Sequence, residues 1–126
     1  MSKTHSLYAA YFSDGRIKIG VTADVPKRMS YYAQEARRNR VSSLTWWSCA
    51  PIEHGTALLI EKSMCRHMRE YAMPRHREWF EGTSTDFQAF ISGLERFRVS
   101  AADSDESPED LPFMGSYGHV MTEARA

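Results

Sequence analysis

Hydrophobic and polar positions in the first quarter of the chain follow the pattern of two paired strands. Residues 7–12 and 17–22 are short runs rich in residues that favour β structure. The segment between them contains Asp14-Gly15, a dipeptide that is typical of a tight hairpin turn. We therefore predict an antiparallel hairpin. Period-two alternation in the second run places Lys18 and Gly20 together on one face, where Gly20 leaves space for a backbone or a phosphate.

Helical spacing of apolar residues appears in three later segments. The first follows a cap at Thr22 or Asp24 and continues through Arg40. A second helix is predicted over residues 55–71 and a third from Ser84 onward, with a strand over residues 43–50 before them. The predicted order is β-β-α-β-α-α. This order indicates an α/β (α+β) fold in which a small three-stranded antiparallel sheet is flanked by helices.

Length and composition indicate an ordinary globular protein. The chain has 126 residues, of which 42% are hydrophobic and 25% charged, and this is enough for one domain with a modest core. No run approaches the roughly 18 consecutive apolar residues of a membrane span, and no signal or transit peptide is evident. Two cysteines are too few for a disulfide framework. We expect a cytoplasmic protein.

The net charge of zero conceals an asymmetry between the two ends of the chain. Residues 101–126 hold one basic and six acidic residues, so residues 1–100 hold 15 basic and 10 acidic residues, a net charge of +5. The acidic segment has too few apolar residues to offset the entropy lost on ordering. We predict a folded domain over residues 1–100 and an acidic, disordered tail over residues 101–126, with a basic surface on the domain.

Several short motifs together carry a resemblance to a known family. The chain resembles the GIY-YIG nuclease superfamily over about residues 7–98, and most closely its phage and plasmid branch, in which a Lys-Ile-Gly triplet forms the second motif and a Glu-Trp-Phe loop follows the second helix. The matching positions are Leu7-Tyr8, Lys18-Ile19-Gly20, Arg28, Glu61 and Glu78-Trp79-Phe80.

The resemblance implies roles for residues of the hairpin. Tyr8 would lie near the scissile phosphate and orient or deprotonate the attacking water, although an ordinary tyrosine pKa near 10 makes it a poor base at neutral pH. Lys18 stands where the family has a second tyrosine, which leaves the identity of the general base open. The residues alone allow other interpretations, in which Tyr8 packs in the sheet and Lys18 is a solvated strand residue.

The first helix supplies two further candidates. Arg28 matches a helical arginine of the family, and a guanidinium can contact two nonbridging phosphate oxygens at once. Tyr32 lies one turn later and matches an aromatic position in repair-type members. A surface arginine and a core tyrosine are the alternatives.

Glu61 is unusual because it follows the apolar run Ala57-Leu58-Leu59-Ile60. Buried carboxylates need a partner, so this one should face a cleft or a cation. The resemblance implies that Glu61 is the sole protein ligand of Mg²⁺, with Mn²⁺ as a substitute and with water and phosphate oxygens completing the octahedron. A salt bridge between Glu61 and Arg28 is the structural alternative, and Glu78 is a second candidate carboxylate.

Arg37, Arg38 and Arg40 are weaker candidates for nucleic-acid binding, with the aromatic residues Trp46 and Trp47 following them. Basic residues also favour the C-terminal end of a helix for electrostatic reasons alone. The spacing of cysteines and histidines gives no zinc motif.

The residues and the resemblance are compatible with two functions. The first is a metal-dependent endonuclease that hydrolyses phosphodiester bonds of DNA by attack of water, with RNA left open as a substrate and with no membrane partner. The second is a catalytically inactive GIY-YIG-like module that binds nucleic acid or protein. Retention of Tyr8, Lys18, Arg28 and Glu61 favours the first.

Overall fold

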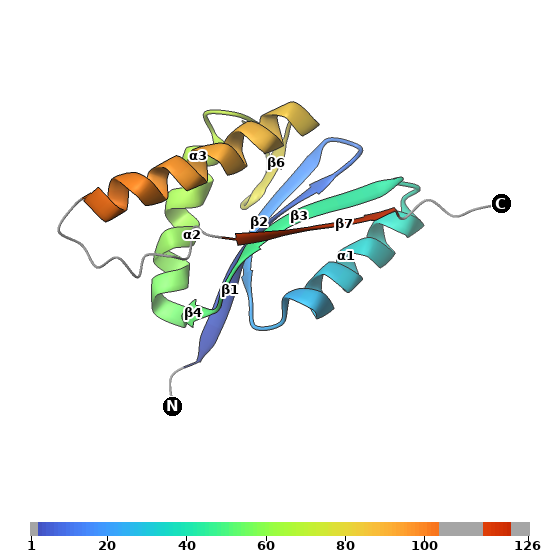
Figure 1. Cartoon of the computed structure of the whole chain (residues 1–126). Coiled ribbons are helices and arrows are strands. Elements are labelled where there is room, and N and C mark those ends of the chain that lie inside the picture. Colours follow the sequence, from blue (N-terminus) through green and yellow to red (C-terminus); the bar gives the residue numbers. More distant parts are fainter. Residues whose placement is uncertain (1–2, 104–114, 122–126) are drawn as a thin grey trace.

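The computed structural model describes residues 3–103 and 115–121. It contains a seven-stranded sheet and three helices in these residues (Figure 1). The helices are α1 (Val25–Arg38), α2 (His54–Met68) and α3 (Ser84–Asp103). The strands are β1 (Thr4–Phe12), β2 (Arg16–Thr22), β3 (Ser43–Cys49), β4 (Ile52–Glu53), β5 (Met73–Pro74), β6 (Trp79–Glu81) and β7 (Gly115–Met121).

The predicted small three-stranded sheet was wrong. The strand order is β5-β6-β2-β1-β3-β7, with β4 paired to the start of β1, and all pairs are antiparallel. Strands β4, β5 and β6 have only two or three residues each, too few to show a period-two pattern. They form because longer neighbours supply the hydrogen-bonding partners.

Strand β7 lies in the segment that the sequence assigned to an acidic tail. It pairs along the whole of β3, from Ser43 opposite Met121 to Cys49 opposite Gly115. The predicted division into residues 1–100 and 101–126 stays a prediction, because most of the acidic run, residues 104–114, lies outside the described residues.

The hairpin of β1 and β2 forms the centre of the sheet. The Gly15 N–H donates to the Phe12 carbonyl at 2.8 Å, and Gly15 has a φ of 107°, which a glycine adopts without a steric penalty. This turn sets the register in which Tyr8 lies opposite Gly20 and Ala10 lies opposite Lys18. The candidate residues Tyr8 and Lys18 therefore occupy neighbouring strands, with Lys18 two residues before the partner of Tyr8.

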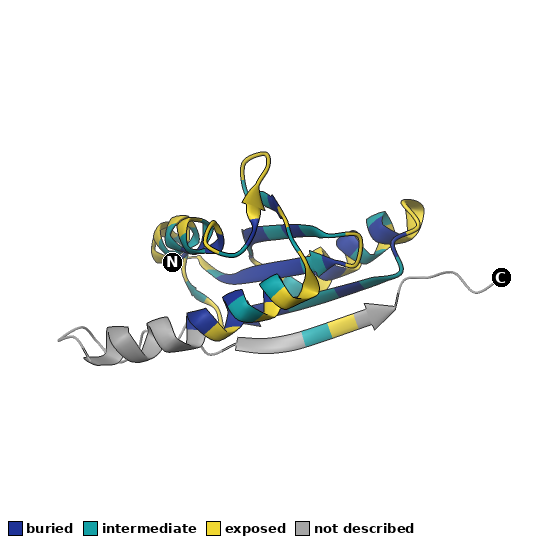
Figure 2. Cartoon of the chain, turned by 90° about the horizontal axis from the view of Figure 1, so that it is seen from above, coloured by how far each residue is buried: buried dark blue, intermediate teal, exposed yellow. Residues whose placement is uncertain are grey.

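Helices cover both faces of the sheet. Helix α1 packs on one face, and α2 and α3 pack on the other (Figure 1). Buried residues fill both interfaces, whereas the outer sides of the helices are exposed (Figure 2). The cluster under α1 includes Tyr8, Ala10, Phe12, Met29, Tyr32 and Leu44. The cluster under α2 and α3 includes Leu7, Ile17, Ile19, Trp47, Met64, Phe87 and Phe90.

Helix α1 begins and ends at clear capping signals. The Asp24 side chain accepts a hydrogen bond from the Lys27 N–H at 3.1 Å, as an N-cap does. At the other end Arg40 has a φ of 60°, its N–H donates to the Arg37 carbonyl at 3.1 Å, and the next N–H, of Val41, donates to Ala36 at 2.8 Å. These two bonds are those of a Schellman motif, so the helix stops before Arg40, where the sequence had extended it.

None of the helices in the described residues is both long enough and apolar enough to cross a membrane.

Candidate active site

A buried pair of tyrosines forms the first part of the candidate site. The hydroxyl oxygens of Tyr8 on β1 and Tyr32 on α1 are 2.7 Å apart, and their side chains are 1% and 4% exposed. The Tyr8 ring lies over Gly20, where an added Cβ would come within 2.4 Å of the Tyr8 hydroxyl. The space predicted above Gly20 is thus occupied by Tyr8 itself.

Arg28 joins this pair from one turn earlier on α1. Its positive charge acts on the hydroxyls of both tyrosines. Burial and the Tyr32 hydroxyl raise the pKa of Tyr8 well above its ordinary value, and Arg28 offsets only part of this rise. Tyr8 therefore stays protonated at neutral pH. It offers a neutral hydroxyl that can orient a ligand, and it does not act as a base.

Lys18 lies on the same face of β2 as Gly20. Its neighbours across the strands, Ala10 and Trp79, both belong to the cluster under α1. The Lys18 Nζ donates to Glu78 Oε1 at 3.2 Å and lies 5.6 Å from the centre of the Trp79 ring. Only 16% of the Lys18 side chain is exposed. This geometry does not match the alternative of a solvated lysine.

Glu61 approaches the site from α2 on the other face of the sheet. Its carboxyl group is half-buried, and burial and then the negative charge of Glu78 raise its pKa, while Lys18 lowers it. Nearby, burial and the charges of Glu61 and Glu78 raise the pKa of Cys65 to about 11. Among the described residues Glu61 makes no salt bridge to Arg28, so its charged neighbours are Glu78 and Lys18.

The two groups lie near the point on β2 where its pairing with β6 ends. Strand β6 pairs with β2 only from Arg16 to Lys18, and the Glu78 carbonyl accepts a last bond from the Ile19 N–H at 3.1 Å. Within the described part of the chain, Gly20 to Thr22 is therefore an edge. Lys18 connects the groups, because it adjoins Gly20 beneath Tyr8 and also binds Glu78 beside Glu61.

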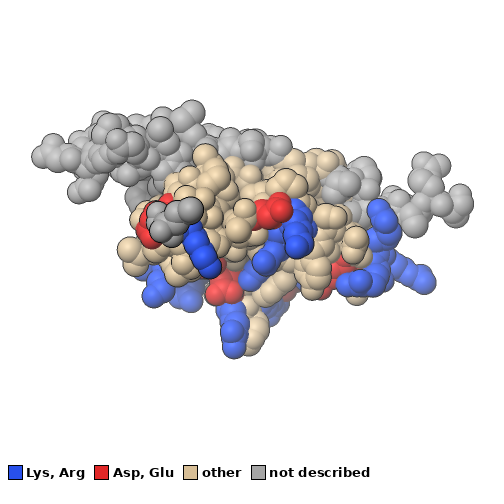
Figure 3. Space-filling model, turned by 90° about the horizontal axis from the view of Figure 1, so that it is seen from below, with Lys and Arg blue, Asp and Glu red and all other residues tan. Residues whose placement is uncertain are grey.

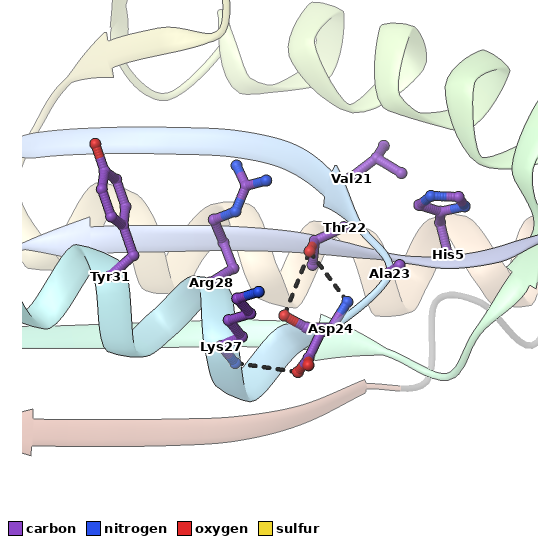
Figure 4. Close-up of a pocket in the computed structure, with 8 residues that line it drawn as sticks. All are labelled: His5, Val21, Thr22, Ala23, Asp24, Lys27, Arg28 and Tyr31. Carbon is purple, nitrogen blue, oxygen red and sulfur yellow. Dashed lines mark hydrogen bonds between the residues drawn. The ribbon is translucent and has the colours of Figure 1, made fainter.

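A hollow of about 680 Å³ opens next to Arg28 at the end of β2. Figure 4 shows the side chains of Arg28 and Tyr31 extending in the same direction from α1, while Lys27 lies beside the Asp24 cap. Tyr31 is 55% exposed. Tyr31 was not among the residues predicted for the site. Its exposed position three residues after Arg28 could have been inferred from helical spacing.

One family model matches most of the chain. It is the T5orf172 domain, and the match covers residues 4–95. The chain belongs to the T5orf172 domain family. The assignment to the GIY-YIG superfamily was wrong, because the matching model is that of a different family, although both families are associated with phage-type nucleases. No curated protein and no solved structure matches the chain.

The T5orf172 family is a nuclease-like or DNA-binding family, so the function of this chain is related to nucleic acids. The matched range runs from β1 into α3 and leaves β7 outside. It includes every residue that the sequence analysis placed in the candidate site: Tyr8, Lys18, Arg28, Tyr32 and Glu61.

The basic residues at the end of α1 are separate from this site of the T5orf172 domain. Arg37 and Arg38 are exposed in the last turn and Arg40 follows them. A rise of 1.5 Å per residue places Arg38 about 15 Å along the helix from Arg28. Figure 3 shows several Lys and Arg side chains, interspersed with acidic ones, on one face of the molecule. Nucleic-acid binding by Arg37, Arg38 and Arg40 stays a prediction.

The donor groups around Glu61 suit a hard divalent cation. Two carboxylates, Glu61 and Glu78, line one hollow, and the pKa of Glu61 is raised first by burial and then by the negative charge of Glu78. In the described residues no three His, Cys, Asp or Glu side chains form a group that could hold a metal ion. A site with only one or two carboxylates fits Mg²⁺, which takes few protein carboxylates and retains water, better than it fits zinc.

Proposed function

We propose that this T5orf172 domain is a metal-dependent nuclease that hydrolyses phosphodiester bonds of DNA. The observation that carries the proposal is the placement of two groups near the point on β2 where its pairing with β6 ends. One group is Tyr8, Tyr32 and Arg28, and the other is Lys18 with the two carboxylates Glu61 and Glu78. Hydroxyls, two cations and a carboxylate pair are the groups that phosphodiester hydrolysis needs.

Arg28 and Lys18 bind the phosphate in this proposal. The exposed Arg28 guanidinium can contact two nonbridging oxygens, where negative charge accumulates as water attacks phosphorus. Lys18 acts as a point charge, held in place by its bond to Glu78. Both cations would stabilise the transition state more than the ground state, because the charge on these oxygens grows during the reaction.

The tyrosine pair orients the reacting groups. The two hydroxyls share one hydrogen bond, so one of their two protons remains free to bond an incoming oxygen. Because the pKa of Tyr8 is raised, both the shared bond and the free proton persist through the neutral range. The hydroxyls thus position a phosphate oxygen or the attacking water, and they do not remove its proton.

Glu61, with Glu78 beside it, would hold Mg²⁺. A bound magnesium ion supplies Lewis-acid polarisation of the phosphate and lowers the pKa of water. The half-buried position of Glu61 limits competition from solvent, and its carboxylate is the group whose loss should abolish metal dependence. Mn²⁺ has similar ligand preferences and should substitute.

Cleavage of plasmid and single-stranded DNA by the purified protein tests this function. We expect nicking in Mg²⁺ or Mn²⁺, no nicking in EDTA, and a loss on the order of 100-fold in Glu61→Gln. Glu70→Gln is the matched control, because Glu70 is exposed and follows the end of the same helix. Equal nicking by wild type and Glu61→Gln would contradict the proposed role of Glu61. Salt-sensitive DNA binding by wild type without any cleavage would favour a catalytically inactive binding module.

A further inference from the structure

The exposed face of α2 and its C-cap residue carry three basic residues beside Glu61. Lys62, Arg66 and Arg69 are all exposed and follow one another at spacings of four and three residues. Residues at these spacings lie on one side of a helix. None of the three was among the predicted site residues.

A fourth basic residue, Arg77, lines the same hollow from the loop between β5 and β6. The Trp79 N–H donates to the His76 carbonyl at 3.0 Å and closes a turn in which Arg77 has a φ of 57°. Residues other than glycine and asparagine rarely adopt this backbone conformation. An arginine in this conformation is compatible with a functional role for its guanidinium, since strained residues concentrate at functional sites.

These four residues and the two carboxylates enclose one hollow of about 440 Å³. Four positive charges from Lys62, Arg66, Arg69 and Arg77 surround two negative charges from Glu61 and Glu78, which leaves a net charge of +2. In the described part of the chain, no salt bridge involves any of the four basic residues. Their charges are therefore available to a ligand.

We propose that Lys62, Arg66, Arg69 and Arg77, here called the α2 rim, bind the phosphate backbone of a nucleic-acid strand beside Glu61. Guanidinium groups match the geometry of phosphate oxygens, and a row of cations matches a row of phosphates. The T5orf172 family has a nucleic-acid related function. The inference rests on the proposed nuclease function for the reaction at Glu61, whereas the binding itself requires no cleavage.

The α1 end provides a matched comparison in the same molecule. Arg37, Arg38 and Arg40 also carry three exposed positive charges, but they line neither the hollow at Glu61 nor the hollow at Arg28. Removing either set changes the net charge of the protein by the same amount. A difference between the two variants therefore reports the location of the bound strand.

The test is the salt dependence of DNA binding, measured by fluorescence anisotropy in EDTA with labelled duplex and single-stranded oligonucleotides. For the duplex, Lys62→Ala/Arg66→Ala/Arg69→Ala should reduce the slope of log K against log [salt] by about 2 to 3, since each phosphate contact contributes about 0.9. Arg37→Ala/Arg38→Ala/Arg40→Ala should reduce it by less than about 1. Equal reductions in the two variants, or a larger one at α1, would overturn the proposal.

Arg77→Gly separates binding from folding. Glycine suits the positive φ at this position, so thermal unfolding should show a Tm equal to or above that of wild type. DNA binding should nevertheless weaken, with a slope lower by about 1. Unchanged binding by this folded variant would overturn the role of Arg77 in the rim.

The two proposals can fail separately. If wild type binds DNA through the α2 rim but does not cleave it, the rim stands and the nuclease function fails. If wild type cleaves DNA and the triple α2 variant binds it with an unchanged salt slope, the nuclease function stands and the rim fails.

Discussion

The arrangement at Gly20 shows how one missing side chain positions the tyrosine pair. Tyr8 lies directly opposite Gly20 in the hairpin, and its ring fills the volume that a Cβ would take. The hydroxyl then reaches Tyr32 on α1. The glycine is required for its small size here, since its backbone φ is not in the positive range.

Gly20→Ala should impair both stability and activity. The new Cβ would approach the Tyr8 hydroxyl to 2.4 Å, so the ring must move. We expect a loss of about 1 to 3 kcal/mol in the free energy of unfolding, and about 10- to 100-fold in cleavage rate, from displacement of the hydroxyl. Denaturant unfolding and single-turnover assays measure the two effects. In the control Gly55→Ala the Cβ meets only the Glu53 carboxylate, at 3.2 Å, and should cost less than in Gly20→Ala, so similar losses in both variants would contradict this account.

Cys65 reports the charge of the carboxylates without requiring catalysis. Because its pKa is raised to about 11, it is a neutral thiol at pH 8, and iodoacetamide should react slowly and then faster as the pH rises toward 11. Bound Mg²⁺ would offset the charges of Glu61 and Glu78 and lower the pKa of Cys65, so it should accelerate alkylation at pH 8. Peptide mass spectrometry distinguishes Cys65 from Cys49. Acceleration that persists in Glu61→Gln would show that the ion binds elsewhere.

At the scale of elements, the end of α1 holds an arginine where helices usually have glycine. Arg40 adopts a φ of 60° within the Schellman motif. Arg40→Gly should raise the free energy of unfolding by up to about 1 kcal/mol, because glycine adopts this φ without strain. Arg38→Gly, in the last turn of the helix, should lower it by up to about 0.5 to 1 kcal/mol. Chemical denaturation gives both values, and changes of the same sign would contradict the assignment of the cap.

Elements with strong local signals were predictable from the sequence. The Asp14-Gly15 turn and the Asp24 cap each act within a few residues, and the hairpin and α1 form around them. The short strands β4 to β6 and the pairing of β7 with β3 depend on partners far along the chain, so local patterns could not reveal them. The predicted sheet was too small for this reason.

The sequence allowed the residues of the candidate site to be selected, but it did not allow their contacts to be predicted. The spacing of Tyr8, Lys18 and Arg28 placed them on the hairpin and on the helix that follows it. Which side chain binds Glu78 depends on how the loop between β5 and β6 lies beside β2, and this contact joins residues 60 positions apart. The alternative of a bond between Glu61 and Arg28 failed because α1 and α2 cover opposite faces of the sheet.

At the scale of the whole molecule, α1 and α2 place their candidate side chains on opposite faces of the sheet, near the open edge of β2. Helix α1 supplies Arg28 and Tyr32 on one face, and α2 supplies Glu61 on the other. The net charge of zero for the full chain conceals a surplus of five basic charges in residues 1–100, part of which gathers on the α2 rim. A nucleic-acid strand that crosses the open half of β2 would contact both groups.

The central claim is that these two groups act on one phosphate. The most direct test is a double-mutant cycle on the single-turnover rate of DNA cleavage in Mg²⁺, using wild type, Arg28→Ala, Glu61→Gln and the double variant. Each single change should cost on the order of 100-fold. If both residues stabilise one transition state, the double variant should lose little more than the worse single variant. Losses that multiply to about 10⁴-fold, or no loss in either single variant, would contradict the claim.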